Sequence, residues 1–345
     1  MFRIHYFAFV FLFSALQPLC AQSDSAAPPS PAAQLEEARG LIRTGHAQDA
    51  LKILDTLRTS DPKLPGLEGA RGDAFYSIDH LQEANNAYEL AVAENPQDLE
   101  AMQMRGLTLF RLGRPGDAIP LLEKAPGKDV QAKADPSYVL ALCYMDTRRF
   151  DDARHAFAGQ YGLPPDSAAA YLLAARMLFR REYIPVAKRF ATTAVSLDPQ
   201  LPLTNELLGE IALAENNFNE AAEYFEKERA RNPLEPSVYE RLGDAYLRSA
   251  RYPAARLVLQ QAILLEPNAT GPYILLGKVT LKEGDATAAS TYLEKAVRMD
   301  PANGMSHNLL AQAYRDMGRM DDVKREMLIV QKIHQADQPK LIAPQ

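Results

Sequence analysis

Small residues return at a fixed interval along almost the whole chain, and this interval constrains the fold more than any other feature of the sequence. Alanines stand 34 residues apart, with a single interval of 35, at Ala50, Ala84, Ala118, Ala153, Ala187, Ala221, Ala255 and Ala289. Prolines follow the same register, with one repeat skipped between Pro96 and Pro165, at Pro62, Pro96, Pro165, Pro199, Pro233, Pro267 and Pro301. Repeats of this length each form one small unit, and consecutive units stack into a continuous core. The 345 residues are therefore predicted to form one repeat array, where length alone would suggest two globular domains.

Each repeat has the pattern of two helices, and residues 236–269 show it most clearly. In the first half, apolar residues recur at spacings of three and four, as on one face of an amphipathic helix, at Tyr239, Leu242 and Tyr246. Gly243 lies on the same face, where the absence of a side chain lets a neighbouring helix come close. The corresponding face of the second half consists of Ala255, Leu259 and Ala262. Pro267 ends the unit, because the residue before a proline is driven out of helical geometry.

A small residue in the first helix, an alanine where the two helices cross and a closing proline resemble the tetratricopeptide repeat family. The resemblance extends over about residues 31–335, with repeats that begin near Pro31, Pro65, Leu99, Ala134, Ala168, Pro202, Pro236, Thr270 and Gly304. It implies an all-α fold, a right-handed superhelical solenoid of about nine antiparallel helix-turn-helix repeats that occupies residues 34–335. The sequence departs from the family pattern in having no Trp, and polar side chains stand where Leu is usual at Glu37, Arg71 and Arg105.

The first 21 residues have the features of a secretory signal peptide. A basic start is followed by an apolar stretch from Tyr6 to Leu16. This stretch is about half of the roughly 20 residues that span a bilayer, which favours a removable signal over an anchor. A lipid at Cys20 is disfavoured, because Leu19 precedes it where lipoprotein signals have Gly or Ala. We therefore expect an exported protein, periplasmic or secreted, whose association with membranes is only indirect.

Two further segments flank the repeats. Residues 22–33 are rich in Pro, Ser and Ala and are predicted to form a flexible linker. Residues 336–345 are predicted to form a C-terminal tail. The last repeat has Val323 in place of the crossing alanine, and its second helix keeps an apolar series at Leu328, Ile329, Val330 and Ile333.

The sequence contains no recognisable pattern of catalytic residues. It has no HExxH, no paired CxxC, no GxSxG and no glycine-rich phosphate loop. Its histidines, His307 among them, are scattered along the chain without metal-ligand spacing, and those in the repeats are interpreted as solvated helix or turn residues. Cys143 occupies a position that other repeats fill with small or apolar residues, so we interpret it as a packing residue. The net charge of −6 with dispersed basic residues argues against nucleic acid as a partner. A non-enzymatic protein without cofactor or metal ion is predicted.

In tetratricopeptide proteins the first helices line a concave groove that binds segments of other proteins, so the resemblance implies such a groove here. Helical spacing places eight residues of the middle three repeats on it: Phe110, Tyr138, Leu142, Met145, Leu172, Arg176, Phe179 and Arg180. The next two repeats add acidic residues at Glu206, Glu210, Glu240 and Asp244. We expect a partner segment to place its apolar side on the rings. Its charges would lie against a basic rim of Arg176 and Arg180 and against the acidic rim formed by these four residues. The position of Phe110 and Phe179 is apolar in eight of nine repeats, which also fits a packing role.

These features predict a scaffold or adaptor outside the cytoplasm that binds another protein or a peptide segment, in envelope assembly, secretion or polysaccharide export. The alternative is a structural oligomer that assembles through the apolar C-terminal helix.

Overall fold

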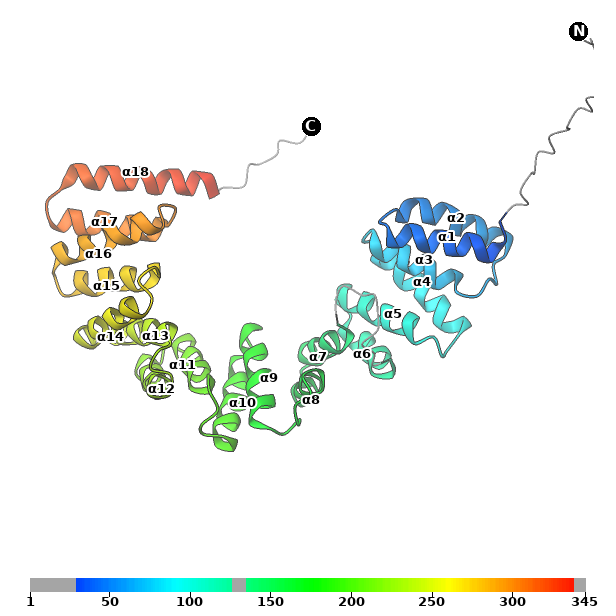
Figure 1. Ribbon diagram of the computed structural model, residues 1–345, viewed down its shortest axis with the longest axis horizontal. Helices are drawn as coiled ribbons and strands as arrows, with labels where there is room; N and C mark the ends of the chain where they lie inside the picture. The colour runs from blue at the N-terminus through cyan, green and yellow to red at the C-terminus, as the bar shows by residue number, and fades with distance from the viewer. Residues whose placement is uncertain (1–28, 126–134, 338–345) are drawn as a thin grey trace, which may run out of the picture. The chain divides into compact units, whose positions relative to one another are not determined.

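The computed structural model describes residues 29–125 and 135–337 of the chain (Figure 1). Within these ranges every regular element is an α-helix. The helices are α1 Pro31–Arg43, α2 Ala47–Ser60, α3 Leu67–Ser77, α4 Leu81–Glu94, α5 Leu99–Arg111, α6 Pro115–Lys124, α7 Pro136–Asp146, α8 Phe150–Gln160, α9 Ala168–Arg180, α10 Ile184–Leu197, α11 Thr204–Ala214, α12 Phe218–Arg231, α13 Pro236–Arg248, α14 Tyr252–Leu265, α15 Thr270–Lys282, α16 Ala286–Met299, α17 Gly304–Asp316 and α18 Met320–Asp337.

The helices pack in consecutive pairs, α1 with α2 through to α17 with α18, and each pair also packs on the next within its unit. Two compact units result, one with α1–α4 and one with α5–α18. The first helix of each repeat begins at the predicted repeat start or two residues after it. The helices that begin two residues after it start at Leu67, Pro136 and Thr204. The predicted all-α fold of stacked helix-turn-helix repeats is confirmed.

Within each pair the two helices approach closely where the small residues recur. A Cβ atom placed on Gly243 would lie 2.4 Å from Cδ2 of Leu259, far inside van der Waals contact. The same residue spacing brings a glycine against a large side chain in four other pairs: Gly72–Tyr88, Gly106–Leu122, Gly209–Phe225 and Gly277–Leu293. The crossing alanines, such as Ala221 and Ala255, are fully buried. The repeating glycines and alanines therefore set the distance between paired helices.

Successive pairs are joined by a recurring tyrosine. The hydroxyl of Tyr246 on α13 donates a hydrogen bond of 2.6 Å to Glu226 on the preceding α12. The guanidinium of Arg251 covers the same ring at 4.3 Å from its centroid, in cation–π geometry. Equivalent bonds link other pairs: Tyr144 with Glu123 and Tyr314 with Glu294. A buried tyrosine whose hydroxyl is satisfied in this way ties α7, α13 and α17 to the repeat before each of them.

The ends of the repeat region differ from the predicted boundaries. Residues 31–33, assigned to the linker, belong to α1, because Ser30 caps the helix by accepting from the Ala33 N–H and Pro31 fits the first turn. The last helix continues to Asp337, into the predicted tail. The signal peptide, most of the linker and the rest of the tail lie outside the described residues. Among the helices of the described ranges, none is both long and apolar enough to cross a bilayer.

His307 does not lie in solvent as predicted. It is buried between α17 and α18, where its two ring nitrogens contact Glu326 and the Pro301 carbonyl. Cys143 is fully buried, and burial, with Asp146 nearby, raises the pKa of its thiol to about 12. The thiol therefore stays protonated and serves packing.

Candidate functional site

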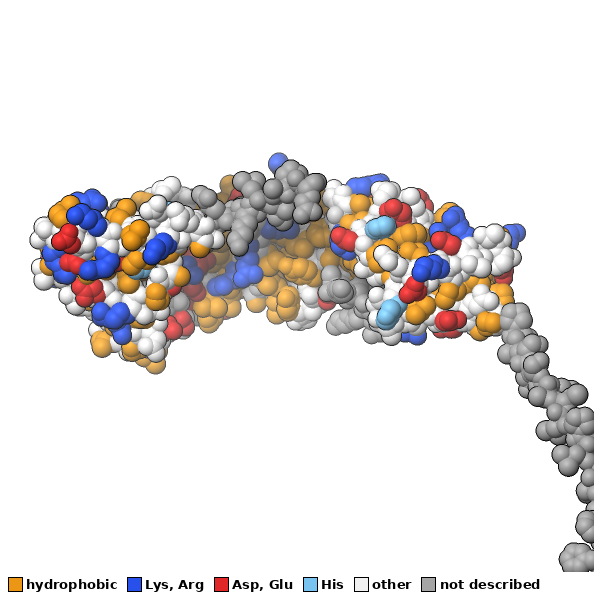
Figure 2. Space-filling model, turned by 90° about the horizontal axis from the view of Figure 1, so that it is seen from above, with side chains coloured by type: hydrophobic (Ala, Val, Ile, Leu, Met, Phe, Trp, Pro, Cys, Tyr) orange, Lys and Arg blue, Asp and Glu red, His pale blue; other side chains and the backbone are white. Residues whose placement is uncertain are grey.

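The first helices of the α5–α18 unit come next to one another. Contacts join α5 to α7, α9 to α11, α13 to α15 and α15 to α17, while the second helices pack behind them. We use the term first-helix surface for those side chains of the first helices that neighbouring helices do not bury. This surface carries five of the eight predicted partner-binding residues. Side chains of both charges are interspersed on the face of the molecule shown in Figure 2.

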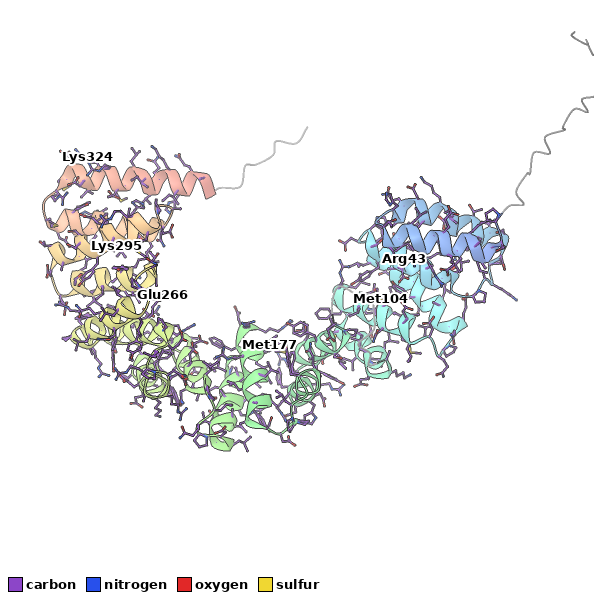
Figure 3. All side chains as sticks on the ribbon, viewed as in Figure 1. Arg43, Met104, Met177, Glu266, Lys295 and Lys324 are labelled. Carbon is purple, nitrogen blue, oxygen red and sulfur yellow. The ribbon has the colours of Figure 1, made fainter. Side chains whose placement is uncertain are left out.

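The structure divides the eight predicted residues into two groups. Phe110, Tyr138, Arg176 and Phe179 are partly exposed and Arg180 is exposed, so a partner can reach them. The other three are buried and support this layer from below: Leu142, Met145 and Leu172. Met104 of α5, labelled in Figure 3, is buried in the same way. The apolar position that recurs in the repeats therefore serves packing at Met145 and offers a ring edge at Phe110 and Phe179.

The predicted acidic rim is largely neutralised within the protein. Arg176 on α9 lies 3.7 Å from Glu206 on α11, whose other oxygen lies 3.3 Å from Nε of Arg241 on α13. Arg241 in turn lies 2.6 Å from Glu210. Burial raises the pKa of Glu206, and Arg241 offsets part of this shift. Four alternating charges thus connect three first helices, so Glu206 and Glu210 are engaged with arginines and do not present free charges to a partner.

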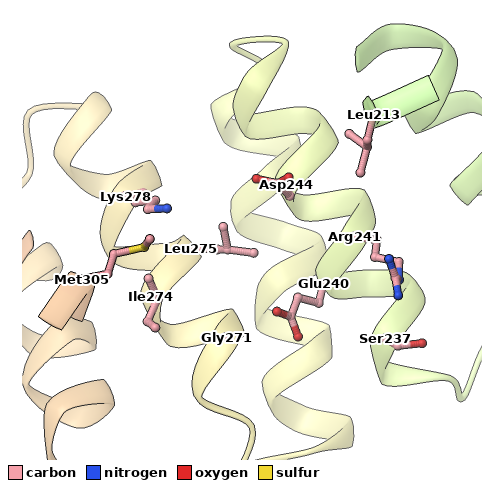
Figure 4. A pocket seen from close by; sticks show the side chains of 10 residues that line it. All are labelled: Leu213, Ser237, Glu240, Arg241, Asp244, Gly271, Ile274, Leu275, Lys278 and Met305. Atoms are coloured by element: carbon pink, nitrogen blue, oxygen red, sulfur yellow. The ribbon is translucent and has the colours of Figure 1, made fainter. Parts of the chain in front are cut away.

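An open pocket of about 470 Å³ lies beyond this chain of charges. Side chains from four first helices, α11, α13, α15 and α17, line it (Figure 4). They are Leu213, Ser237, Glu240, Arg241, Asp244, Gly271, Ile274, Leu275, Lys278 and Met305. Sequence reasoning found two of them, Glu240 and Asp244, as acidic surface residues. It missed the pocket, which depends on how successive repeats are spaced.

The charged groups of the pocket differ in whether they are paired. Asp244 lies 2.9 Å from Arg248, and Arg241 holds Glu206 and Glu210. Glu240 and Lys278 make no hydrogen bond or ion pair with any other residue of the described ranges. Burial raises the pKa of Glu240, Arg241 opposes the shift, and the nearby acids Glu266 and Asp244 add to it. Glu266 ends α14 and is labelled in Figure 3.

Apart from Ser237 and Gly271, the uncharged lining of the pocket is apolar. Ile274 and Leu275 are buried and form the floor of the pocket, whereas Met305 on α17 is exposed at its edge. A pocket with an apolar floor and a few polar groups is the usual form of a recognition site. No cluster of three His, Cys, Asp or Glu side chains that could hold a metal ion occurs among residues 29–125 and 135–337.

A family model described as tetratricopeptide repeat matches residues 70–136, 138–200, 207–272 and 274–322. The chain is also similar to solved structures, at low identity. MamA of Desulfovibrio magneticus RS-1 is 19% identical, with 50% of this chain and 98% of that chain covered and a TM-score of 0.48. YrrB, described as a TPR protein with an unusual peptide-binding site, is 19% identical, with 55% and 95% covered and a TM-score of 0.46. Yeast Tom70 is 13% identical, with 90% and 92% covered and a TM-score of 0.42. No protein of curated function matches the sequence.

Proposed function

The chain belongs to the tetratricopeptide repeat family, and from this premise we propose that it is a scaffold that holds a segment of another protein on the first-helix surface of α5–α17. The observation that supports this most is the open pocket across α11, α13, α15 and α17, where Glu240 and Lys278 carry charges that no other described residue pairs. Partly exposed rings at Phe110 and Phe179 extend the apolar part of the surface. Aromatic and charged side chains of this kind supply most of the binding energy of protein interfaces.

The scaffold acts outside the cytoplasm, in envelope assembly, secretion or polysaccharide export. Support for this comes from the amino-terminal sequence, where an apolar stretch of signal-peptide length precedes the repeats. A reporter that is active only after export tests this location. It is fused to the full chain and to a chain without residues 1–21. Activity that depends on residues 1–21 agrees with export, and equal activity of both fusions contradicts it.

Partner capture tests the binding surface. Phe110→Ala, Phe179→Ala and Arg180→Glu change exposed or partly exposed side chains of first helices, whereas Leu257→Ala changes a side chain of α14 that is 66% exposed on a second helix. We expect the first three variants to recover less partner from an extract of the native cell, with unchanged helicity. Equal recovery by all four variants would reject the first-helix surface.

A second function, self-assembly through the last helix, has an observation of its own. Met320, Met327 and Leu328 on α18 are exposed, and no further repeat follows to cover them among the described residues. Light scattering on the mature chain and on Leu328→Glu distinguishes the two functions. A mass above the monomer that Leu328→Glu reduces favours assembly, and a monomer in both samples excludes it.

A further inference from the structure

We propose that the pocket between α13 and α15 binds a basic side chain, lysine or arginine, of a protein segment, and that the carboxylate of Glu240 is the group that recognises it. The proposal rests on the proposed function, because it names the chemistry that the scaffold recognises at one point of the first-helix surface.

The first step concerns the missing partner of Glu240. This side chain is half-buried, yet no residue in the described ranges donates a hydrogen bond to it or forms an ion pair with it. Its neighbours are already engaged, Arg241 with two glutamates and Asp244 with Arg248. A half-buried carboxylate without a hydrogen-bond partner has lost part of its hydration, and Arg241 compensates this only in part. A cation that enters the pocket provides the missing contact.

The second step excludes the ordinary structural role of such a carboxylate, which is to cap a helix. Glu240 lies against the first turn of α15, since a Cβ on Gly271 would be 2.0 Å from its Oε1 atom. Ala269 precedes this helix without a side-chain cap, so free N–H groups are close. None of them donates to Glu240. Gly271 therefore leaves room for the carboxylate, which remains available to a ligand.

The third step concerns the sign of the charge. Burial raises the pKa of Glu240 most, Arg241 opposes this shift, and the nearby carboxylates of Glu266 and Asp244 add to it. A ligand with a positive charge reverses this effect, whereas an acidic ligand adds to it. The floor of Ile274 and Leu275 suits the methylene stem of lysine or arginine, whose charged end then reaches Glu240.

The fourth step separates Glu240 from the one basic group of the pocket that lacks a partner. Lys278 follows Gly271 by seven residues on α15, which is about 10 Å along a helix axis. In Figure 4 Lys278 lies on the Met305 side of the pocket, whereas Glu240 lies close to Gly271. Lys278 therefore does not fill the place of the basic side chain beside Glu240.

Selection from a random nonapeptide library displayed on phage tests the proposal without a known partner. The full chain is used as wild type, as Glu240→Gln and as Glu223→Gln, which alters an exposed glutamate of α12 outside the pocket. We expect lysine or arginine to be enriched at one peptide position with wild type and Glu223→Gln, and not with Glu240→Gln.

Titration of one selected peptide makes the test quantitative. Replacement of its arginine by citrulline, which keeps the shape and removes the charge, should weaken binding to wild type by about tenfold or more, because charged hydrogen bonds are the strong ones. The same replacement should have less than about a twofold effect on Glu240→Gln. Melting curves confirm that both variants fold.

The outcomes separate this inference from the proposed function. Peptides whose binding is lost in Phe179→Ala but which show no preference for basic residues overturn the role of Glu240 and leave the scaffold intact. Enrichment of acidic residues that depends on Lys278 also overturns it. Selection that enriches no peptide on wild type counts against both.

Discussion

Nδ1 of His307 lies 2.6 Å from Oε2 of Glu326, across the contact between α17 and α18. The other ring nitrogen lies 3.1 Å from the carbonyl oxygen of Pro301, and both side chains are buried. A carboxylate oxygen and a carbonyl oxygen face the two ring nitrogens. Each contact is therefore a hydrogen bond only when a hydrogen lies between the nitrogen and the oxygen. This polar pair fastens the last helix, which has no following repeat among the described residues.

Loss of Glu326 should therefore loosen the last repeat. Glu326→Ala leaves the buried His307 nitrogen without a partner, and an unsatisfied buried group costs about 1–3 kcal/mol. We expect amide hydrogen exchange in α17 and α18 to accelerate correspondingly, with little change in α5–α10, because repeats interact mainly with their neighbours. His334→Ala, which changes an exposed side chain of the same helix, is the control and should leave the exchange rates unchanged.

The distance between paired helices should respond to a single methyl group. Gly243→Ala places a Cβ within 3 Å of Leu259 and should lower the free energy of unfolding by about 1–3 kcal/mol through overpacking. Gly116→Ala is the matched control, since nothing lies within 4 Å of the Cβ it adds to α6. Urea unfolding compares the two. Equal stability of both variants would contradict the close approach at Gly243.

Alkaline pH should weaken the contact between α12 and α13 that the Tyr246 hydroxyl makes with Glu226. Burial, aided by the bond to Glu226, raises the pKa of Tyr246 to about 12. The unfolded chain releases this proton near pH 10, before the folded chain does, so the contribution of Tyr246 is present below pH 10 and is lost as pH rises toward 12.

Measurements of unfolding free energy between pH 9 and 12 should show this loss. Tyr246→Phe should be less stable than wild type at pH 9, with a shallower decline above pH 10. Tyr161→Phe, which alters an exposed ring, serves as the control. Parallel declines in wild type and Tyr246→Phe would show that the Tyr246 hydroxyl does not contribute.

The alternating charges between α9 and α13 should behave as one unit. Arg241→Gln leaves Glu206, whose side chain is only 10% exposed, without its closest cation. Removal of the cation from a buried carboxylate destabilises, here by only about 1–3 kcal/mol, because Arg241 itself is partly exposed and Arg176 still lies nearby. Glu206→Gln combined with Arg241→Gln should recover part of the loss in thermal unfolding. Additive effects of the two substitutions would show that the contact carries no coupling.

The repeat architecture could be predicted because its signals are local. Ala255, Pro267 and their equivalents mark a helix crossing and a helix end in every repeat, and the observed helices begin within two residues of the predicted starts. Gly243 could be assigned to a close contact for the same reason. The linker was predicted to end at residue 33, whereas α1 begins at Pro31, because a proline after serine begins a helix as readily as it continues a linker.

The candidate site was less accessible to prediction because its contacts join different repeats. Helical spacing placed Met145 on the groove but could not show that its neighbours bury it. Arg241 neutralises Glu206 from the next repeat, and His307 meets Glu326 from the next helix, contacts that no pattern within one helix indicates. The place of Glu240 against Gly271 depends in the same way on how α13 and α15 are stacked.

Photocrosslinking in the native cell tests most directly whether the first-helix surface holds another protein. A benzophenone amino acid is introduced in place of Phe110, Phe179 or, as the control on a second helix, Leu257. We predict the same adduct with a second protein from the Phe110 and Phe179 positions and none from Leu257. Adducts of equal yield from all three positions, or adducts only between copies of this chain, would contradict a partner held on the first helices.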